Sequence, residues 1–211
     1  MGNIVIRDVE AGDISTIKNI IREVWDWGEL IEDEQTLDAA LGLYLNQVLH
    51  SGTFGKVAVL NDKVAGVIFG SVDGIEPKYR MLMEDGTAHA LTLLGASESD
   101  RKNLYELLSK LTDAYKQLVE GILDNYDGKL DFFALATEAQ GLGIGKSLWI
   151  ALKTYFEENN TKSIYLYTDT ECNFGFYDNQ GFVRKGVQEV PFDFDGEFFK
   201  TDIFLYEFFV R

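Results

Sequence analysis

The sequence predicts an α/β fold of the α+β type, in which helices flank a central mixed β-sheet. In the second half of the chain, a buried strand, a glycine-rich turn, a helix and another strand follow one another, which is typical of a right-handed crossover between parallel strands. Two aromatic segments near the end of the chain instead indicate an antiparallel pair. The 211 residues are 46% hydrophobic, which is enough for one sizeable core. We therefore expect a single domain over residues 1–211.

The first 52 residues predict a strand and two helices. Residues 4–7, Ile-Val-Ile-Arg, have the composition of a short strand. Apolar residues then recur at helical spacing, so we expect a helix that Asp13 caps and that ends at Gly28. A second helix is expected to begin near Asp33 and to stop at residues 51–52. Its apolar stripe consists of Leu37, Ala40, Leu41, Tyr44, Leu45 and Val48.

A hairpin and a long connection are expected next. Two apolar runs, residues 57–60 and 64–69, flank the turn Asn61-Asp62-Lys63, which indicates two antiparallel strands. From about residue 73 to residue 129 the pattern changes, and the part that contains Pro77 is expected to be irregular.

A long helix is predicted inside that connection. Ser97-Glu98-Ser99-Asp100 resembles a capping box. Behind it, apolar residues alternate at spacings of 4 and 3 and mark one stripe along a helix of roughly 24 residues. Fewer than four heptads are a weak coiled-coil signal, so we expect this stripe to pack on its own domain, and pairing into a homodimer is the alternative. The stripe consists of Leu104, Leu108, Leu111, Tyr115, Leu118 and Ile122.

The second half predicts a regular alternation of elements. Residues 130–136 are expected to form a buried strand, and the helix that follows the glycine turn ends at Asn159-Asn160. One face of this helix carries Ile144, Leu148, Leu152 and Tyr155. The remaining elements are a strand over 163–167, a short helix over about 172–179, and strands over about 182–190 and 199–209.

Charge and composition exclude several classes of function. The net charge is −16, from 19 basic and 35 acidic residues, which disfavours binding to a nucleic-acid backbone. The sequence contains no run of about 18 apolar residues, so no membrane span is expected. The first residues lack the pattern of a secretory signal. A single Cys and two His argue against a disulfide and against a metal site built on several such ligands. We therefore expect no nucleic acid, no membrane and no metal, and a cytoplasmic location.

The glycine-rich turn Gln140-Gly141-Leu142-Gly143-Ile144-Gly145-Lys146-Ser147 is the clearest motif. It is neither a P-loop, which needs glycine where Gln140 stands, nor a Rossmann motif, which needs glycine where Lys146 stands. Its small residues still allow an anion to approach the backbone closely, and the helix start offers free amides and a positive dipole end. A diphosphate fits this turn, with added charge from Lys146. The alternative is a tight turn without a ligand.

This turn resembles the signature of the GNAT N-acetyltransferase superfamily, which is Gln or Arg, two residues, Gly, one residue, then Gly or Ala. Gln140, Gly143 and Gly145 match that signature. Residues 133–139 resemble the exit of the family's fourth strand, although Thr137 stands where many members have proline.

A second signature lies further along the chain. Residues 173–182 resemble the family's Asn followed four positions later by Tyr, ahead of Gly-Phe. The resemblance covers most of residues 3–72 and 130–190. It implies a GNAT-like fold, in which residues 73–129 are a largely helical insertion between the third and fourth strands.

The resemblance also implies a donor, acetyl-CoA, and a set of residues that bind it. Backbone groups of Leu135 and Thr137 would bind the pantetheine arm, and Asn173 would bind it from the other side. Tyr177 would protonate the departing thiolate, a role that suits a phenol because its ordinary pKa is near 10. The alternatives are a packed aromatic for Tyr177 and a helix cap for Asn173. The pyrophosphate would lie on the turn formed by Gln140, Gly141, Leu142, Gly143, Ile144, Gly145 and Lys146.

The acceptor is expected to be a primary amine of a small molecule or a peptide. Residues 25–34 and 190–198, which flank the acceptor site in this family, mix carboxylates with aromatics, a combination that holds organic cations such as polyamines. The alternative is two solvated acidic loops whose aromatics point inward. The carboxylates concerned are Asp26, Glu29, Asp193 and Asp195.

Two questions stay open at the level of the sequence. The base that deprotonates the amine is unassigned, although Asp131 and Glu138 bracket the fourth strand. The second hypothesis for the whole chain is a non-catalytic domain that binds or senses acyl-CoA, for which the segment 73–129 would be a partner surface.

Overall fold

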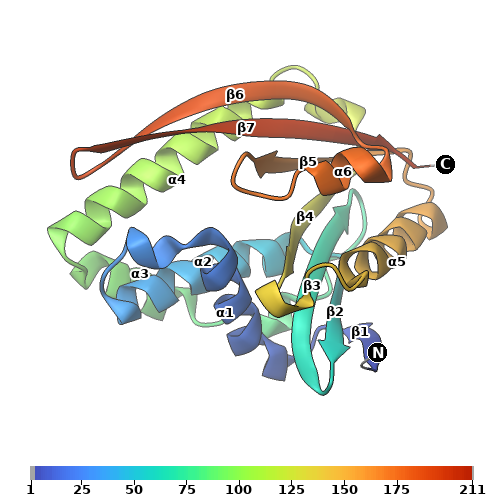
Figure 1. Cartoon of the computed structure of the whole chain (residues 1–211), viewed down its shortest axis with the longest axis horizontal. Coiled ribbons are helices and arrows are strands. Elements are labelled where there is room, and N and C mark those ends of the chain that lie inside the picture. Colours follow the sequence, from blue (N-terminus) through green and yellow to red (C-terminus); the bar gives the residue numbers. More distant parts are fainter. Residues whose placement is uncertain (1–2, 211) are drawn as a thin grey trace.

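The structure, a computed structural model, describes residues 3–210 and contains one seven-stranded mixed sheet flanked by helices (Figure 1). The strand order is β1-β2-β3-β4-β5-β7-β6. Neighbouring strands are antiparallel except β4 and β5, which are parallel. This confirms the predicted mixed sheet. The strands are β1 (Ile4–Asp8), β2 (Phe54–Leu60), β3 (Lys63–Val72), β4 (Gly128–Leu135), β5 (Ser163–Asp169), β6 (Val183–Phe194) and β7 (Glu197–Phe209).

Hydrophobic side chains pack against both faces of this sheet. Because side chains alternate along a strand, Val57 and Val67 belong to one core, and Ala58 and Ile68 to the other. Helices α1, α2 and α4 cover the first face, and α5 and α6 cover the second. The helices are α1 (Ile14–Trp25), α2 (Glu34–Ser51), α3 (Gly86–Gly95), α4 (Glu98–Leu118), α5 (Ile144–Glu158) and α6 (Gly175–Gln180).

The first helix differs from its prediction at both ends. The Asp13 carboxylate does not cap α1, because it accepts two hydrogen bonds from Arg7, at 2.7 and 2.8 Å, and one from the backbone amide of Glu10. At the other end, Asp26 adopts the left-handed conformation with φ of 50° and ends the helix. Gly28 lies beyond it, in a short 3-10 turn.

The second helix and the hairpin follow their predictions. The Asp33 carboxylate accepts a hydrogen bond from the amide of Thr36 and caps α2, which ends before Gly52. Asn61 and Asp62 have φ of 50° and 65°, and these positive values are those of a type I′ turn between paired antiparallel strands.

The β3–β4 connection, residues 73–127, contains a helix that the sequence analysis missed. Helix α3 begins after Asp85, whose carboxylate accepts hydrogen bonds from the amides of Thr87 and Ala88. An Asp before the helix, a run over residues 88–94 that is rich in Ala and Leu, and a final Gly at position 95 are a usable signal. The irregular composition around Pro77 obscured it.

Helix α4 has 21 residues, and its buried side differs from the predicted stripe. Leu104 is buried as expected, but Leu108 is 44% exposed, and Leu107 and Ala114 are buried in its place. The capping box is only half formed. The Ser97 hydroxyl accepts a hydrogen bond from the amide of Asp100. The Asp100 carboxylate accepts a hydrogen bond from the amide of Glu32, in the loop between α1 and α2.

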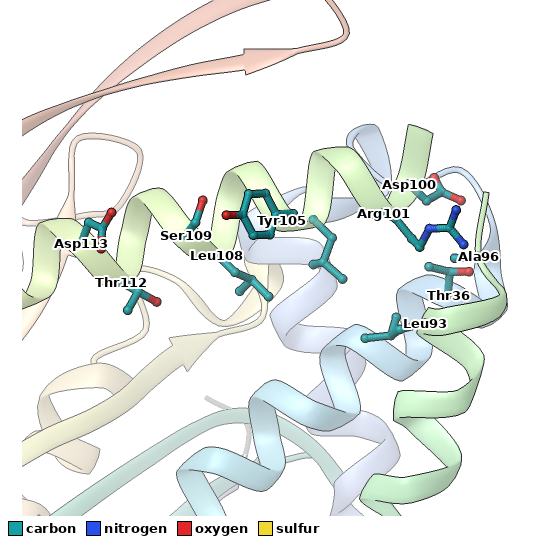
Figure 2. Close-up of a pocket in the computed structure, with 11 residues that line it drawn as sticks. Thr36, Leu93, Ala96, Asp100, Arg101, Tyr105, Leu108, Ser109, Thr112 and Asp113 are labelled. Atoms are coloured by element: carbon teal, nitrogen blue, oxygen red, sulfur yellow. The ribbon is translucent and has the colours of Figure 1, made fainter. Parts of the chain in front are cut away.

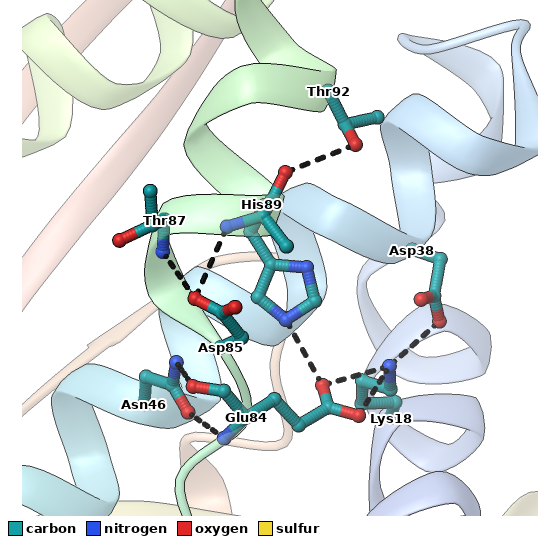
Figure 3. A network of polar contacts seen from close by, with 9 residues as sticks. Lys18, Asp38, Asn46, Glu84, Asp85, Thr87, His89 and Thr92 are labelled. Atoms are coloured by element: carbon teal, nitrogen blue, oxygen red, sulfur yellow. Dashed lines mark hydrogen bonds and ion pairs between the residues drawn. The ribbon is translucent and has the colours of Figure 1, made fainter.

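Glu84 ties the β3–β4 connection to the first two helices (Figure 3). Its carboxylate accepts a hydrogen bond from the Lys18 ammonium at 2.9 Å and lies 3.2 Å from Nε2 of His89. Its backbone exchanges two hydrogen bonds with the side-chain amide of Asn46. Burial alone lowers the pKa of Lys18, but hydrogen bonds from its ammonium to Asp38 and Glu84 outweigh this and raise it. The buried ammonium is therefore paired and charged.

The second half of the chain follows the predicted order of strand, turn, helix and strand. The last two strands are longer than expected and form a curved hairpin along one edge of the molecule (Figure 1). Helix α4 lies beside this hairpin, between β6 and the layer of α1–α3 (Figure 1). Among residues 3–210, no helix combines the length and the apolar character that crossing a membrane requires.

Candidate active site

Strands β4 and β5 separate and form a wedge at the centre of the sheet. They pair only through Gly128 with Ile164 and Lys129 with Tyr165, at their first residues. Beyond Lys129, β4 stays paired with β3, while β5 pairs with β7 over its whole length. The backbone groups on the facing sides of β4 and β5 therefore have no strand partner in the wedge, and they are free to bind an extended ligand.

The glycine-rich turn lies at the end of β4 and leads into α5. Gly143 is the residue before the first turn of α5, with φ of 79°, and no side chain caps this helix end. A Cβ atom added at Gly141 or Gly143 would meet no atom within 4 Å, so there is open space beside the backbone here. The turn therefore presents unpaired amides and room for an anion, which fits the pyrophosphate that the sequence predicts at residues 140–146.

The turn, the end of β4 and the short helix α6 meet at one point. A Cβ atom added at Gly145 would lie 3.3 Å from the side chains of Phe133 and Leu135, and 3.7 Å from Phe176. The rings of Phe133 and Phe176 are 5.4 Å apart. The structure thus brings together the two motifs that are about 30 residues apart in the sequence.

One predicted ligand of the pantetheine arm already has a partner in the protein. The backbone amide of Thr137 donates a hydrogen bond to the Glu23 carboxylate of α1 at 3.0 Å. A donor molecule that uses this amide must displace Glu23. Leu135 ends β4 one residue before Ala136, whose own amide is bound to the backbone oxygen of Ala65.

Tyr177 and Asn173 lie where α6 approaches the wedge. The Tyr177 side chain is buried against Phe182 and Tyr206. Burial, with smaller contributions from Cys172 and Asp169, raises its pKa well above the ordinary value, so the phenol keeps its proton at neutral pH.

Asn173 is exposed and does not cap α6. The residue before the first turn of α6 is Phe174, and no side chain caps the helix, which begins three residues later than predicted. The Asn173 amide is therefore not committed to the role of a helix cap.

An aromatic cluster covers β4 on the opposite face from α6. Trp25 stacks on Trp27 and makes edge contacts with Tyr44 of α2 and Phe132 of β4, with ring centroids 4.7–5.6 Å apart. Trp27 is buried. The aromatics of the segment 25–34 thus point inward, as the alternative interpretation of this segment expects.

The two predicted acceptor segments, residues 25–34 and 190–198, both contact helix α4. Helix α4 lies between the segments: the Asn103 amide donates to the backbone oxygen of Leu30, and the amide of Asp193 donates to the Glu106 carboxylate. Asp193 accepts a hydrogen bond from the amide of Gly196, so its carboxylate closes the hairpin turn.

Asp195 is held by the start of α4. Its carboxylate accepts hydrogen bonds from the Ser99 hydroxyl and the Lys102 ammonium, which lower its pKa. Both carboxylates therefore already accept hydrogen bonds from the protein itself, and their role in binding a cationic acceptor stays a prediction.

Asp131 is the functional candidate on which the sequence analysis was undecided. Phe69 pairs with Phe132 and Gly70 pairs with Leu130, so Asp131 has no partner on β3 and forms a β-bulge. Its side chain is only 6% exposed. One carboxylate oxygen, Oδ1, lies 3.7 Å from the Lys129 ammonium, and the other, Oδ2, is buried without a hydrogen-bond partner. A bulge depends on the register between two strands, which sequence periodicity does not show.

Two hollows lie on the same side of the sheet as the aromatic cluster. One, of about 610 Å³, is bordered by the starts of β4 and β5 and the end of β3, and includes Asp131. The other, of about 630 Å³, is an open groove between α3 and α4 (Figure 2). Leu93, Leu104 and Tyr105 line this second groove, and none of the predicted site residues does. Within residues 3–210, no cluster of His, Cys, Asp and Glu is arranged to hold a metal ion.

Comparisons with known proteins agree with this fold. A model of the acetyltransferase (GNAT) family matches residues 16–182. An N-acetyltransferase from Staphylococcus aureus Mu50 superposes with a TM-score of 0.56 at 15% identity, over 99% of each chain. A ribosomal-protein-alanine N-acetyltransferase from Brucella melitensis gives 0.56 at 15% identity, over 97% of this chain and 99% of the other.

A third structure is described with a bound ligand. The protein yncA from Salmonella typhimurium, solved with its cofactor acetyl-CoA, gives a TM-score of 0.55 at 13% identity, over 99% of this chain and 94% of the other. At these identities the likeness to each structure is one of fold. No curated protein sequence matches the chain.

Proposed function

Because the chain belongs to the GNAT family of acetyltransferases, we propose that it transfers an acetyl group from acetyl-CoA to the primary amine of a small molecule or a peptide. The observation that carries this proposal is the wedge between β4 and β5, which has the glycine-rich turn at the end of β4.

The donor would bind along the wedge. Its pyrophosphate would lie on the amides of residues 141–146, where no side chain caps α5 and Lys146 is exposed. The backbone of β4 near Leu135, together with the Thr137 amide once it is released from the Glu23 carboxylate, would hold the pantetheine arm, with Asn173 on the other side. Binding against a net charge of −16 requires this local set of amides, since the overall field repels a polyanion.

Tyr177 would act as the acid. When the amine nitrogen attacks the acetyl carbon, the departing sulfur needs a proton, and a phenol with a raised pKa holds one at neutral pH. The buried position of Tyr177 supports this role, because a water-poor setting strengthens a hydrogen bond from the hydroxyl to the sulfur.

The alternative function is a domain that binds acyl-CoA without turnover. Release of CoA, followed in a thiol assay over a panel of primary amines, separates the two. An acetyltransferase releases CoA at a rate that depends on the amine, whereas a sensor binds the donor and releases none. Calorimetry with acetyl-CoA on the same sample shows whether the donor binds at all, so a negative assay has a clear meaning.

A further inference from the structure

The buried carboxylate of Asp131 and the hollow beside it form one site that the predicted donor-binding residues do not include. We propose that this hollow binds the acceptor as an ammonium ion and that Asp131 takes the proton from it. This proposal rests on the proposed acetyl transfer, and adds the chemical class of the acceptor and the identity of the base. The site, called the acidic hollow below, is lined by Asp73, Asp124, Asp127, Lys129, Asp131 and Tyr165, among others.

The charge of the acidic hollow favours a cation. Four of its lining residues are Asp, and the only basic one is Lys129. Asp127 accepts a hydrogen bond from the amide of Lys162, and Asp73 and Asp124 are exposed at the rim. Four carboxylates against one ammonium attract a positively charged ligand, and this attraction has the same sign as the field of the whole chain.

The protein's own Lys129 indicates how an ammonium sits in this place. Its Nζ atom lies 5.8 Å from the ring centre of Tyr165, 5.7 Å from that of Tyr167, and 3.7 Å from the Asp131 carboxylate. These distances are those of cation–π contacts and of an ion pair. Aromatic faces and a carboxylate therefore already accommodate one ammonium, and Oδ2 of Asp131 is buried and has no hydrogen-bond partner.

The position of Asp131 connects the acidic hollow to the wedge. Lys129 is the last residue of β4 that pairs with β5, so Asp131 stands at the point where the two strands separate. The β-bulge turns its side chain to the same face as Phe132. Tyr44 of α2 packs against Phe132, the residue next to Asp131, with ring centroids 5.9 Å apart.

The electrostatic setting makes Asp131 a stronger base than an exposed Asp. Burial raises the pKa of Asp131, and the Lys129 ammonium and the Ser71 hydroxyl lower it only in part. A carboxylate whose pKa is raised accepts a proton from an ammonium more readily than an exposed Asp does. The other titratable groups around it are Tyr44 of α2, Tyr165 of β5, and Asp73, Asp124, Tyr126 and Asp127 at the edge of the acidic hollow.

The proposed step balances in atoms and electrons. The ammonium gives one proton to Asp131, and the lone pair of the resulting amine forms a bond to the acetyl carbonyl carbon. The carbon–sulfur bond breaks and leaves its electron pair on sulfur, which takes the proton of Tyr177. The second proton that the nitrogen loses restores Tyr177, and Asp131 releases its proton to water. The products are an amide, CoA and one proton.

Steady-state kinetics of Asp131→Asn test the assignment, with 1,4-diaminobutane as acceptor and acetyl-CoA kept saturating. Asn preserves the size of the side chain but cannot take the proton. We expect kcat to fall by about 10²-fold or more. The affinity for acetyl-CoA, measured by calorimetry, should not change, and the melting temperature should stay the same or rise because a poorly paired buried charge is removed.

The pH dependence of kcat/KM separates a base from a structural residue. In the unmodified enzyme kcat/KM should fall with decreasing pH as Asp131 becomes protonated, and the residual activity of Asp131→Asn should lack this acidic limb. Full activity of the variant, or a reduced activity with the limb intact, would overturn the proposal. If the variant does not fold, the unmodified enzyme still tests the proposal. A kcat/KM that stays constant down to the pH range in which an ordinary Asp titrates would overturn it.

The acidic hollow has its own test. Asp73→Asn combined with Asp124→Asn should raise KM for 1,4-diaminobutane several-fold and leave kcat nearly unchanged, because a rim charge attracts the ligand without touching the reacting atoms. The matched control is Asp62→Asn, which removes one charge in the β2–β3 turn and should change neither constant. An unchanged KM in the double variant would show that the acceptor does not bind there.

The failure of this inference and that of the proposed function look different. An unmodified protein that binds acetyl-CoA but releases no CoA with any amine contradicts the transfer itself, and the Asp131 assignment with it. An active unmodified enzyme whose Asp131→Asn variant is equally active contradicts only the assignment. Glu138, beyond the other end of β4, is the alternative base, and Glu138→Gln tests it. If the pH profile of this variant lacks the acidic limb, the role of the base belongs to Glu138.

Discussion

At the scale of single residues, Gly143 is the position where the donor site is easiest to test. Its φ of 79° and the open space around it favour glycine, and the amides beside it are unpaired. Gly143→Glu should weaken acetyl-CoA binding by about 10²-fold, or roughly 2.7 kcal/mol, because a side chain and a negative charge would occupy the pyrophosphate site. Calorimetry measures this, with Gly196→Glu as control, since that glycine has φ of 92° and equally open surroundings in the β6–β7 turn. Equal affinities of both variants would contradict the site.

Tyr177 carries the second prediction at this scale. Tyr177→Phe keeps the ring that packs against Phe182 and Tyr206, so the fold and the affinity for the donor should be preserved. Loss of the hydroxyl should lower kcat by about 10²-fold, because the thiolate then lacks its acid. Single-turnover CoA release compares the two proteins. Full activity of the Phe variant would mean that another group protonates the sulfur.

At the scale of elements, the start of β4 depends on Gly128. A Cβ atom there would lie 2.7 Å from the backbone oxygen of Ser71, which cannot move without disturbing the β3–β4 pairing. Gly128→Ala should therefore destabilise the fold by about 1–3 kcal/mol. Gly95→Ala, at the end of α3 with nothing within 4 Å, is the matched control and should be neutral or stabilising. Thermal unfolding of the two variants tests this prediction. Equal melting temperatures would contradict the clash between a Cβ atom at position 128 and the backbone oxygen of Ser71.

The elements also show how far the sequence leads. Strands, the hairpin and the crossover helix were predictable, because their apolar periods and turn residues are local. The buried side of α4 was not, because this helix packs against two surfaces at once, and Leu107 and Ala114 replace Leu108. For the candidate site, the glycine turn was predictable from the sequence itself, whereas the roles of Tyr177 and Asn173 came from family resemblance. The bulge at Asp131 follows from strand register, which no local pattern encodes.

At the scale of the whole molecule, the net charge of −16 acts with opposite sign on the two proposed substrates. Salt shortens the Debye length from about 30 Å at 0.01 M to about 10 Å at 0.1 M. The field that repels the anionic donor and attracts a cationic amine is screened in that range. We therefore expect Kd for acetyl-CoA to fall and KM for 1,4-diaminobutane to rise between these two concentrations. Calorimetry and steady-state kinetics measure the two trends, and trends of the same sign would mean that local contacts outweigh the overall field.

Helix α4 is bonded to two distant segments of the chain through two of its carboxylates. Asp100 accepts a hydrogen bond from the amide of Glu32, in the loop between α1 and α2, and Glu106 accepts one from the amide of Asp193 in β6. Because both segments are bonded to the same helix, a displacement of one segment should displace the other. In hydrogen exchange, the amides of Glu32 and Asp193 should gain or lose protection together when an acceptor binds, although the chain separates them by more than 150 residues. Asp100→Ala should therefore lower the hydrogen-exchange protection of the Asp193 amide as well as that of the Glu32 amide.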